Sequence, residues 1–125
     1  MMDPIADMLV IIKNGYLAQK SYITIPYSKM KLEIANVLEK EEFIGHVSRK
    51  NSNIIAELIF DGHKPRLTQV QRVSKLGLRI YTKSKKIKPV KGGRGFVIVS
   101  TSKGLMTGKE ANKKNLGGEI ICRVW

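Results

Sequence analysis

Apolar residues recur at helix spacing near the start of the chain, at Ile5, Met8, Leu9 and Ile12. This spacing places them on one face of a helix. Asp3-Pro4 is a typical helix start, a capping carboxylate followed by proline at the first helical position, and Asn14-Gly15 predicts the end. Val10 and Ile11 widen the apolar face, so we expect this helix to be covered on more than one side or to contact a partner.

A second helix and three strands follow in the first half. Residues 22–26 alternate like a short strand, which Pro26 closes. Ser28 then caps a helix whose apolar residues keep a 3.6-residue period and which ends before residue 43. Strands at about 43–50 and 53–60 are separated by Asn51-Ser52-Asn53, a hairpin signal. The first half therefore reads α-β-α-β-β.

The second half is mostly strand. Short strands are predicted at 67–73 and 78–82, around a turn at Ser74–Gly77, and a last strand at 119–125. Val97, Ile98 and Val99 are β-branched and contiguous, so both faces of their strand should be covered. Thr107 and Glu110 form a capping box for one short helix that Leu116-Gly117-Gly118 ends. The fold class is α+β, in two small domains, the second mostly β with one short helix.

Charge divides the chain more sharply than any linker. Residues 1–63 contain 7 Lys and Arg and 8 Asp and Glu. Residues 64–125 contain 16 Lys and Arg but only 2 Asp and Glu, out of 23 and 10 in the whole chain. The break Asp61-Gly-His-Lys-Pro65 falls where the sign changes. We expect an N-terminal α/β domain at 1–63 and a C-terminal basic domain at 64–125, of which the second contacts a polyanion.

The chain lacks the marks of an exported or membrane protein. It has no run approaching 18 apolar residues, and its first residues, Met-Met-Asp-Pro, have neither the basic start nor the apolar stretch of a signal peptide. The single cysteine, Cys122, sits among apolar residues and is expected to pack as a small hydrophobe. We expect a soluble cytosolic protein with no membrane partner.

The sequence offers few residues in patterns suited to catalysis or metal binding. Gly104–Glu110 has the wrong glycine spacing and lacks Ser or Thr after its lysine, so it is not a phosphate-binding loop of the nucleotide triphosphatases. His46 and His63 have no cysteine or further histidine at ligand spacing. The basic half offers only Glu110 and Glu119 as carboxylates. The sequence therefore predicts no catalytic residue, metal, cofactor or small-molecule substrate.

A polar tip follows the apolar strand at 96–99. Ser100, Thr101 and Ser102 can exchange hydrogen bonds with phosphate, ribose or base edges, while Lys103 adds charge and Gly104 allows a turn. The same cluster is also common in plain turns. Around it lie cations with Tyr81 and Phe96 interleaved: Arg72, Lys75, Arg79, Lys83, Lys85, Lys86, Lys88, Lys91, Arg94 and Lys103. Tyr81 suits a half-buried core position and base stacking equally, whereas Phe96 is expected to pack inward.

With these residues assembled, the chain resembles the bacterial-type family of small-subunit ribosomal protein eight. The matching motifs are Asp-Pro-Ile-Ala-Asp-Met-Leu at 3–9, Ile-Ala-Asn-Val-Leu at 34–38, Gln-Arg-Val-Ser-Lys at 71–75, Gly-Leu-Arg-Ile-Tyr at 77–81, Ser-Thr-Ser-Lys-Gly at 100–104 and Gly-Gly-Glu-Ile-Ile-Cys at 117–122. They run in order from end to end. The resemblance implies a structural constituent of the small ribosomal subunit that binds the central domain of its ribosomal RNA and helps the platform assemble.

The resemblance also implies where RNA would bind. Ser100, Thr101 and Ser102, with Tyr81 and the turn at Gly117, Gly118 and Glu119, would face an irregular RNA helix, and a secondary contact would use Lys13, Asn14, Lys29 and Lys31. From the charge of the second half, rather than from the resemblance, we expect Arg79, Lys88 and Lys103 to anchor on phosphates, with Gly104 completing the polar tip. Neighbouring ribosomal proteins are further implied partners, and members of the family often also repress their own messenger RNA. The implied location is the cytoplasmic ribosome, with an organellar ribosome left open.

Four positions depart from the family pattern. Ile11 stands where the family usually has an arginine, Leu76 replaces a usual proline, Gly108 replaces a usual aspartate, and Arg94 adds charge. None lies in the hydroxyl tip. We therefore predict binding rather than catalysis, against two rivals: an RNA-modifying or RNA-cleaving enzyme, which the shortage of carboxylates disfavours, and a general DNA-compacting protein, which competition with duplex DNA would reveal.

Overall fold

The computed structural model describes residues 3–75, 77–83 and 95–125. These residues form two compact units, Pro4–Thr68, and Gln69–Trp125 together with Asp3. The first unit has the predicted order α-β-α-β-β followed by a small hairpin, and the second is mostly β with one short helix. The predicted α+β fold class is confirmed.

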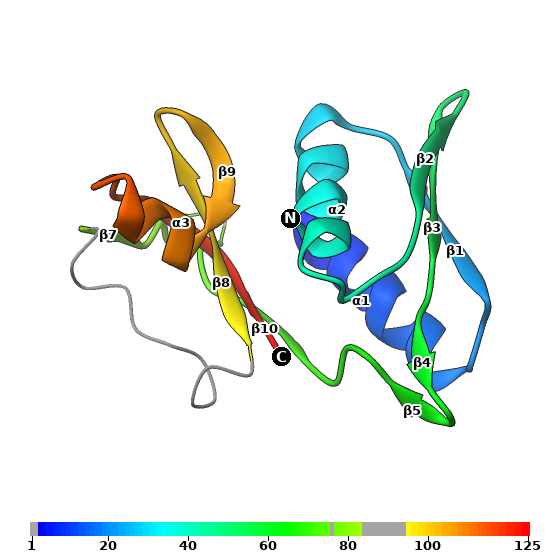
Figure 1. Cartoon of the computed structure of the whole chain (residues 1–125). Helices are drawn as coiled ribbons and strands as arrows, with labels where there is room; N and C mark the ends of the chain where they lie inside the picture. The colour runs from blue at the N-terminus through cyan, green and yellow to red at the C-terminus, as the bar shows by residue number, and fades with distance from the viewer. Residues whose placement is uncertain (1–2, 76, 84–94) are drawn as a thin grey trace. The chain divides into compact units, whose positions relative to one another are not determined.

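The first unit is a three-stranded antiparallel sheet with two helices on one face (Figure 1). Its elements are α1 (Pro4–Leu17), β1 (Tyr22–Pro26), α2 (Lys29–Lys40), β2 (Val47–Lys50) and β3 (Asn53–Glu57), with the strands in the order β1-β3-β2. Ile23 and Ile25 of β1 are buried toward the helices, whereas Tyr22 and Thr24 are exposed on the other face. The Ser28 cap is confirmed, since its hydroxyl accepts a hydrogen bond from the Lys31 N–H at 3.2 Å.

A short hairpin, β4 (Phe60–Asp61) with β5 (Lys64–Pro65), completes this unit. The Arg66 guanidinium donates to both carboxylate oxygens of Asp61 at 3.0 Å, and this hydrogen bonding lowers the pKa of Asp61. Contacts thus hold residues 64–68 to the first unit. The domain boundary expected between residues 63 and 64 from charge stays a prediction.

The predicted end of the first helix at Asn14-Gly15 is wrong, because α1 continues to Leu17. Gly15 is buried inside the helix, where an added Cβ would lie 2.5 Å from Cγ2 of Ile23. The glycine therefore serves close packing of α1 on β1. The helix ends at Leu17, and Gln19 just beyond it has a left-handed φ of 53°.

The second unit is a five-stranded antiparallel sheet with the chain's last strand at its centre. Its elements are β6 (Val70–Arg72), β7 (Tyr81–Thr82), β8 (Phe96–Thr101), β9 (Gly104–Thr107), α3 (Gly108–Lys113) and β10 (Gly118–Val124). β10 pairs with β6 and β7 along one edge and with β8 along the other, and β9 pairs with β8 (Figure 1). Val97, Ile98 and Val99 are at most 5% exposed, so the predicted coverage of both faces is confirmed.

Several element boundaries differ from the predicted ones. The strands predicted at 43–50, 53–60, 67–73 and 78–82 are shorter, and β9 was not predicted at all. Thr107 does cap α3, accepting from the Glu110 N–H at 3.2 Å, but the helix ends at Lys113 rather than near Gly117. Five of the cations that the sequence places around the polar tip, Lys85, Lys86, Lys88, Lys91 and Arg94, lie outside the described residues.

Two buried polar features belong to the core of the second unit. Burial raises the pKa of the Cys122 thiol to about 12, which fits the predicted role of a small hydrophobe. Arg72 is paired with Asp3 at 3.1 Å and donates to the Ile121 carbonyl at 2.7 Å, and its side chain is only 9% exposed. Arg72, which the sequence placed among the phosphate-binding cations, is therefore a structural residue.

Candidate nucleic-acid interface

Three predicted site residues from separate segments lie in one row across the second sheet. In the strand register, Tyr81 of β7 is opposite Glu119 of β10, and Glu119 is opposite Ser100 of β8. Directly opposite residues on antiparallel strands share a face of the sheet. The Tyr81 side chain is 70% exposed, so of its two predicted roles the structure disfavours the core position and leaves its ring accessible for stacking.

The loop that presents Arg79 and Tyr81 is fixed by a buried serine. The Ser74 hydroxyl accepts from the Ile80 N–H at 2.9 Å and donates to the Ile80 carbonyl at 3.3 Å. The Ile80 carbonyl also accepts from the Ile120 N–H of β10 at 2.8 Å. Sequence reasoning treated Ser74 as a turn residue, and no pattern around it distinguishes a buried clamp from an exposed turn.

The side chains of Arg79 and Glu119 form an ion pair. Nη1 of Arg79 lies 3.0 Å from Oε2 of Glu119, with the two side chains 45% and 15% exposed. This hydrogen bond raises the pKa of Arg79. Because a guanidinium carries five N–H donors, Arg79 keeps donors for a phosphate. Glu119 therefore orients a cation rather than presenting a free carboxylate.

The predicted hydroxyl tip is the turn between β8 and β9. Oγ1 of Thr101 donates to the Gly104 carbonyl at 2.8 Å and accepts from the Lys103 N–H at 3.1 Å. Gly104 has a φ of +106°, which favours glycine. Ser102 and Lys103 are exposed at the turn, and Ser100 is half-buried. The three hydroxyls thus differ, since Thr101 holds the turn while Ser102 is presented to solvent.

Glycine is required where β10 begins beside the end of β8. A Cβ added to Gly118 would lie 2.1 Å from the Ser100 carbonyl oxygen, well inside van der Waals contact. Gly117 precedes it and is exposed. The small residue therefore lets the two strands approach where Glu119, Ser100 and Tyr81 line up.

The secondary group of predicted residues belongs to the first unit. Lys13 and Asn14 lie on α1, half-buried and exposed, and Lys29 and Lys31 lie in the first turn of α2. Nζ of Lys31 donates to the Pro26 carbonyl at 3.2 Å. Lys88 is outside the described residues.

The described residues offer no alternative chemistry at this surface. They contain no group of three or more His, Cys, Asp or Glu side chains placed to hold a metal ion. Among these residues, too, none of the helices combines the length and the apolar character needed to cross a membrane. What the geometry brings together is cations, donors and one exposed ring, the side chains that bind phosphate, ribose and base.

Comparison with known proteins gives one consistent match. The family described as ribosomal protein S8 matches residues 3–125. Proteins named small ribosomal subunit protein uS8 are 47% identical in Caldanaerobacter subterraneus subsp. tengcongensis, over 100% of this chain and 98% of the relative, and 43% identical in Trichormus variabilis, over 98% and 97%. The protein named uS8c of Chlorella vulgaris is 43% identical over 98% of each chain. With matches that extend through both units, this chain belongs to the ribosomal protein S8 family.

Proposed function

We propose that this protein is a structural component of the small ribosomal subunit that binds small-subunit ribosomal RNA mainly through residues 64–125. The observation that carries the proposal is the row of Tyr81, Glu119 and Ser100 beside the exposed Ser102-Lys103 turn, on the sheet of the strongly basic half of a chain in this family. The role is structural rather than enzymatic.

The proposal involves two kinds of contact, one that attracts phosphates and one that recognises RNA structure. Exposed cations of the second unit attract phosphates without regard to sequence, and those that the structure describes are Lys75, Arg79, Lys83, Lys103, Lys109, Lys113 and Lys114. Tyr81 stacks on a base or ribose, and the Ser102 hydroxyl bonds a polar edge. A regular RNA duplex hides its base edges in a deep, narrow groove, so these contacts select a helix with bulged or unstacked nucleotides.

We further propose that the target lies in the central domain of the ribosomal RNA and that binding helps the platform assemble beside neighbouring ribosomal proteins. The test is sedimentation of the tagged full-length protein with ribosomal subunits from its own cells, followed by hydroxyl-radical footprinting. We expect the protein in the small-subunit fraction, with protections confined to an irregular central-domain helix. Protein found only at the top of the gradient, or equal protection of duplex DNA, would contradict the proposal.

Substitutions at Ser102 and Tyr81, compared with one at Lys109, should separate recognition of RNA structure from attraction to phosphates. Ser102→Ala with Tyr81→Leu should reduce the preference for the irregular helix over plain RNA duplex by roughly tenfold, since stacking on one base contributes about 1–3 kcal/mol. Lys109→Ala, which removes an exposed cation from α3, should weaken binding to both RNAs alike. Filter binding of both RNAs at one salt concentration measures the two ratios. An equal loss on both RNAs from the double variant would show that the turn and Tyr81 do not read RNA structure.

A further inference from the structure

The β1 edge of the first sheet is open. Strand order is β1-β3-β2, and among the described residues β1 pairs with no strand on its outer side. The Ser21 carbonyl accepts from the Leu58 N–H at 2.9 Å, whereas the N–H of Glu57 donates toward β2, to the His46 carbonyl at 3.0 Å. Because hydrogen-bonded and non-bonded pairs alternate along antiparallel strands, Tyr22 and Thr24 direct their backbone N–H and C=O groups outward.

The same edge is blocked at one end. Pro26, the next outward-facing position, has no N–H, and Nζ of Lys31 donates to its carbonyl at 3.2 Å. Proline and lysine are common protections of strand edges. The part of the edge that stays available therefore runs along Tyr22 and Thr24.

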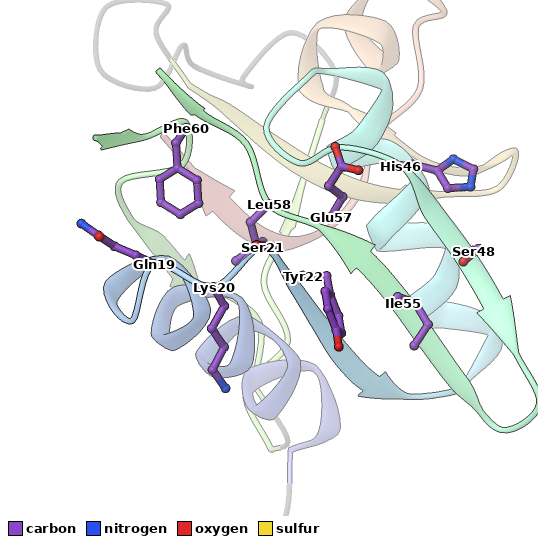
Figure 2. A pocket seen from close by; sticks show the side chains of 10 residues that line it. All are labelled: Gln19, Lys20, Ser21, Tyr22, His46, Ser48, Ile55, Glu57, Leu58 and Phe60. Atoms are coloured by element: carbon purple, nitrogen blue, oxygen red, sulfur yellow. The ribbon is translucent and has the colours of Figure 1, made fainter. Parts of the chain in front are cut away.

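A groove of about 860 Å³ lies along this available part, between α1 and β1. Ile11, Asn14 and Gly15 line it from α1, Ala18 lines it just beyond that helix, and Tyr22, Ile23 and Thr24 line it from β1. Lys20 is the only charged residue in the lining. Figure 2 shows Lys20 and Tyr22 among the residues that line a second hollow, and both residues also line this groove.

The helix next to the groove also exposes apolar side chains. Leu17 is 72% exposed and Val10 is 53% exposed, and they lie seven residues apart on α1. A seven-residue separation returns to nearly the same side of a helix. The wide apolar face noted in the sequence is thus not fully covered within the described residues.

We propose that this groove binds an extended peptide segment of another protein, which adds to β1 as an antiparallel strand and places a carboxylate at Lys20. Strand addition would satisfy the outward backbone groups of Tyr22 and Thr24. The peptide residue opposite Ile23 would point toward Ile11 of α1 and toward Ala18, which follows that helix, so it should be apolar. An antiparallel strand finishes near the beginning of β1, which brings its C-terminal end to Lys20.

Nucleic acid is a poorer occupant of the same groove. A phosphate backbone needs several cations along its path, whereas this lining supplies one lysine, and its other polar residues, Asn14, Gln19, Ser21 and Thr24, carry no charge. A peptide needs one cation for its terminal or side-chain carboxylate and a row of backbone donors and acceptors. The proposal is independent of RNA binding by the second unit.

The test uses the full chain and a synthetic hexapeptide of alternating serine and valine with a free C-terminal carboxylate, followed by amide NMR shifts. We expect saturable shifts confined to residues 11–24. Thr24→Pro, which removes one outward N–H as Pro26 already does, should weaken binding at least roughly tenfold, the loss expected for a backbone hydrogen bond and its geometry. The matched control Thr24→Val keeps the N–H and should stay within about twofold of the original affinity.

Two further measurements, one with a Lys20 variant and one with a methylated peptide, test the charge pair and the backbone hydrogen bonds separately. Lys20→Gln should weaken the carboxylate peptide several-fold and leave its C-terminal amide unchanged, as removal of one charge pair predicts. A peptide N-methylated at the residues facing Tyr22 and Thr24 should not bind, even if Thr24→Pro fails to fold. Equal binding of the methylated peptide, no binding at all, pairing of two copies of the chain through β1, or shifts at residues 20–24 produced by single-stranded RNA instead would each overturn the proposal.

Discussion

Raising potassium chloride from about 50 to about 200 mM should weaken binding of the full-length protein to its ribosomal RNA target roughly 10²- to 10³-fold. For each phosphate that the protein neutralises, the logarithm of the binding constant falls by about 0.7–0.9 for every tenfold rise in salt. The expected loss assumes about five such phosphates. The excess charge that drives this loss lies in residues 64–125, with 16 Lys and Arg against 2 Asp and Glu. Titration of fluorescently labelled RNA at four or more salt concentrations measures the slope.

Two neighbouring residues of the β8–β9 turn provide the matched comparison. Lys103→Gln should reduce the slope by roughly one phosphate equivalent, because it removes an exposed cation. Ser102→Ala should change affinity but leave the slope unchanged, because a hydroxyl releases no counterion. A salt response close to zero in the original protein would rule out phosphate contacts as the source of affinity.

Gly118→Ala should lower the free energy of unfolding of the second unit by about 2–4 kcal/mol, at the upper range for overpacking of a tight site. The new Cβ would meet the Ser100 carbonyl oxygen at 2.1 Å, so a backbone rather than a flexible side chain must move. Since Ser100 pairs with Glu119 in the same place, RNA affinity should fall with stability. Trp125, the only tryptophan, packs against Val97 and Val99 and reports unfolding of this unit by fluorescence in denaturant.

Gly45→Ala is the control for a less demanding glycine. Its added Cβ would lie 2.8 Å from Oε1 of Glu57, which can rotate away, and 3.1 Å from Cβ of Glu57, which needs only a small shift. The cost should therefore be about 1 kcal/mol, below that of Gly118→Ala. RNA affinity should not change. If the two alanine variants unfold at the same denaturant concentration as the original protein, the close approach of β10 to β8 does not limit stability.

The starts of α1, α2 and α3 were predictable from the sequence, whereas the ends of α1 and α3 were not. Ser28 and Thr107 act locally through their own hydroxyls, so the signal lies within four residues. Each end instead uses a left-handed residue other than glycine, at Gln19, Glu42 and Asn115. In each case the next N–H returns to the helix, as Lys20 does to the Gly15 carbonyl at 3.0 Å. Glycine was therefore a misleading marker at residues 15 and 117.

The candidate site was predictable in its residue types but not in its pairings. The motifs around residues 77–81, 100–104 and 117–122 identified the segments, yet the row from Tyr81 to Ser100 depends on the register of three strands. Burial also gives different roles to residues that the sequence does not distinguish. Arg72 and Arg79 look alike in sequence, but Arg72 pairs with Asp3 in the interior while Arg79 stays 45% exposed. Side-chain environment, which sequence spacing does not encode, separates the structural Arg72 from the accessible Arg79.

The central position of β10 has a consequence for how the chain is made. Strands β6, β7 and β8 all pair with this later segment, so during translation they must wait for it. Residues 4–68 can acquire their structure while the remainder is still being synthesised. The basic half, in contrast, would leave the translating ribosome as an open, cationic polymer whose valine- and isoleucine-rich segments stay unprotected until β10 has been made.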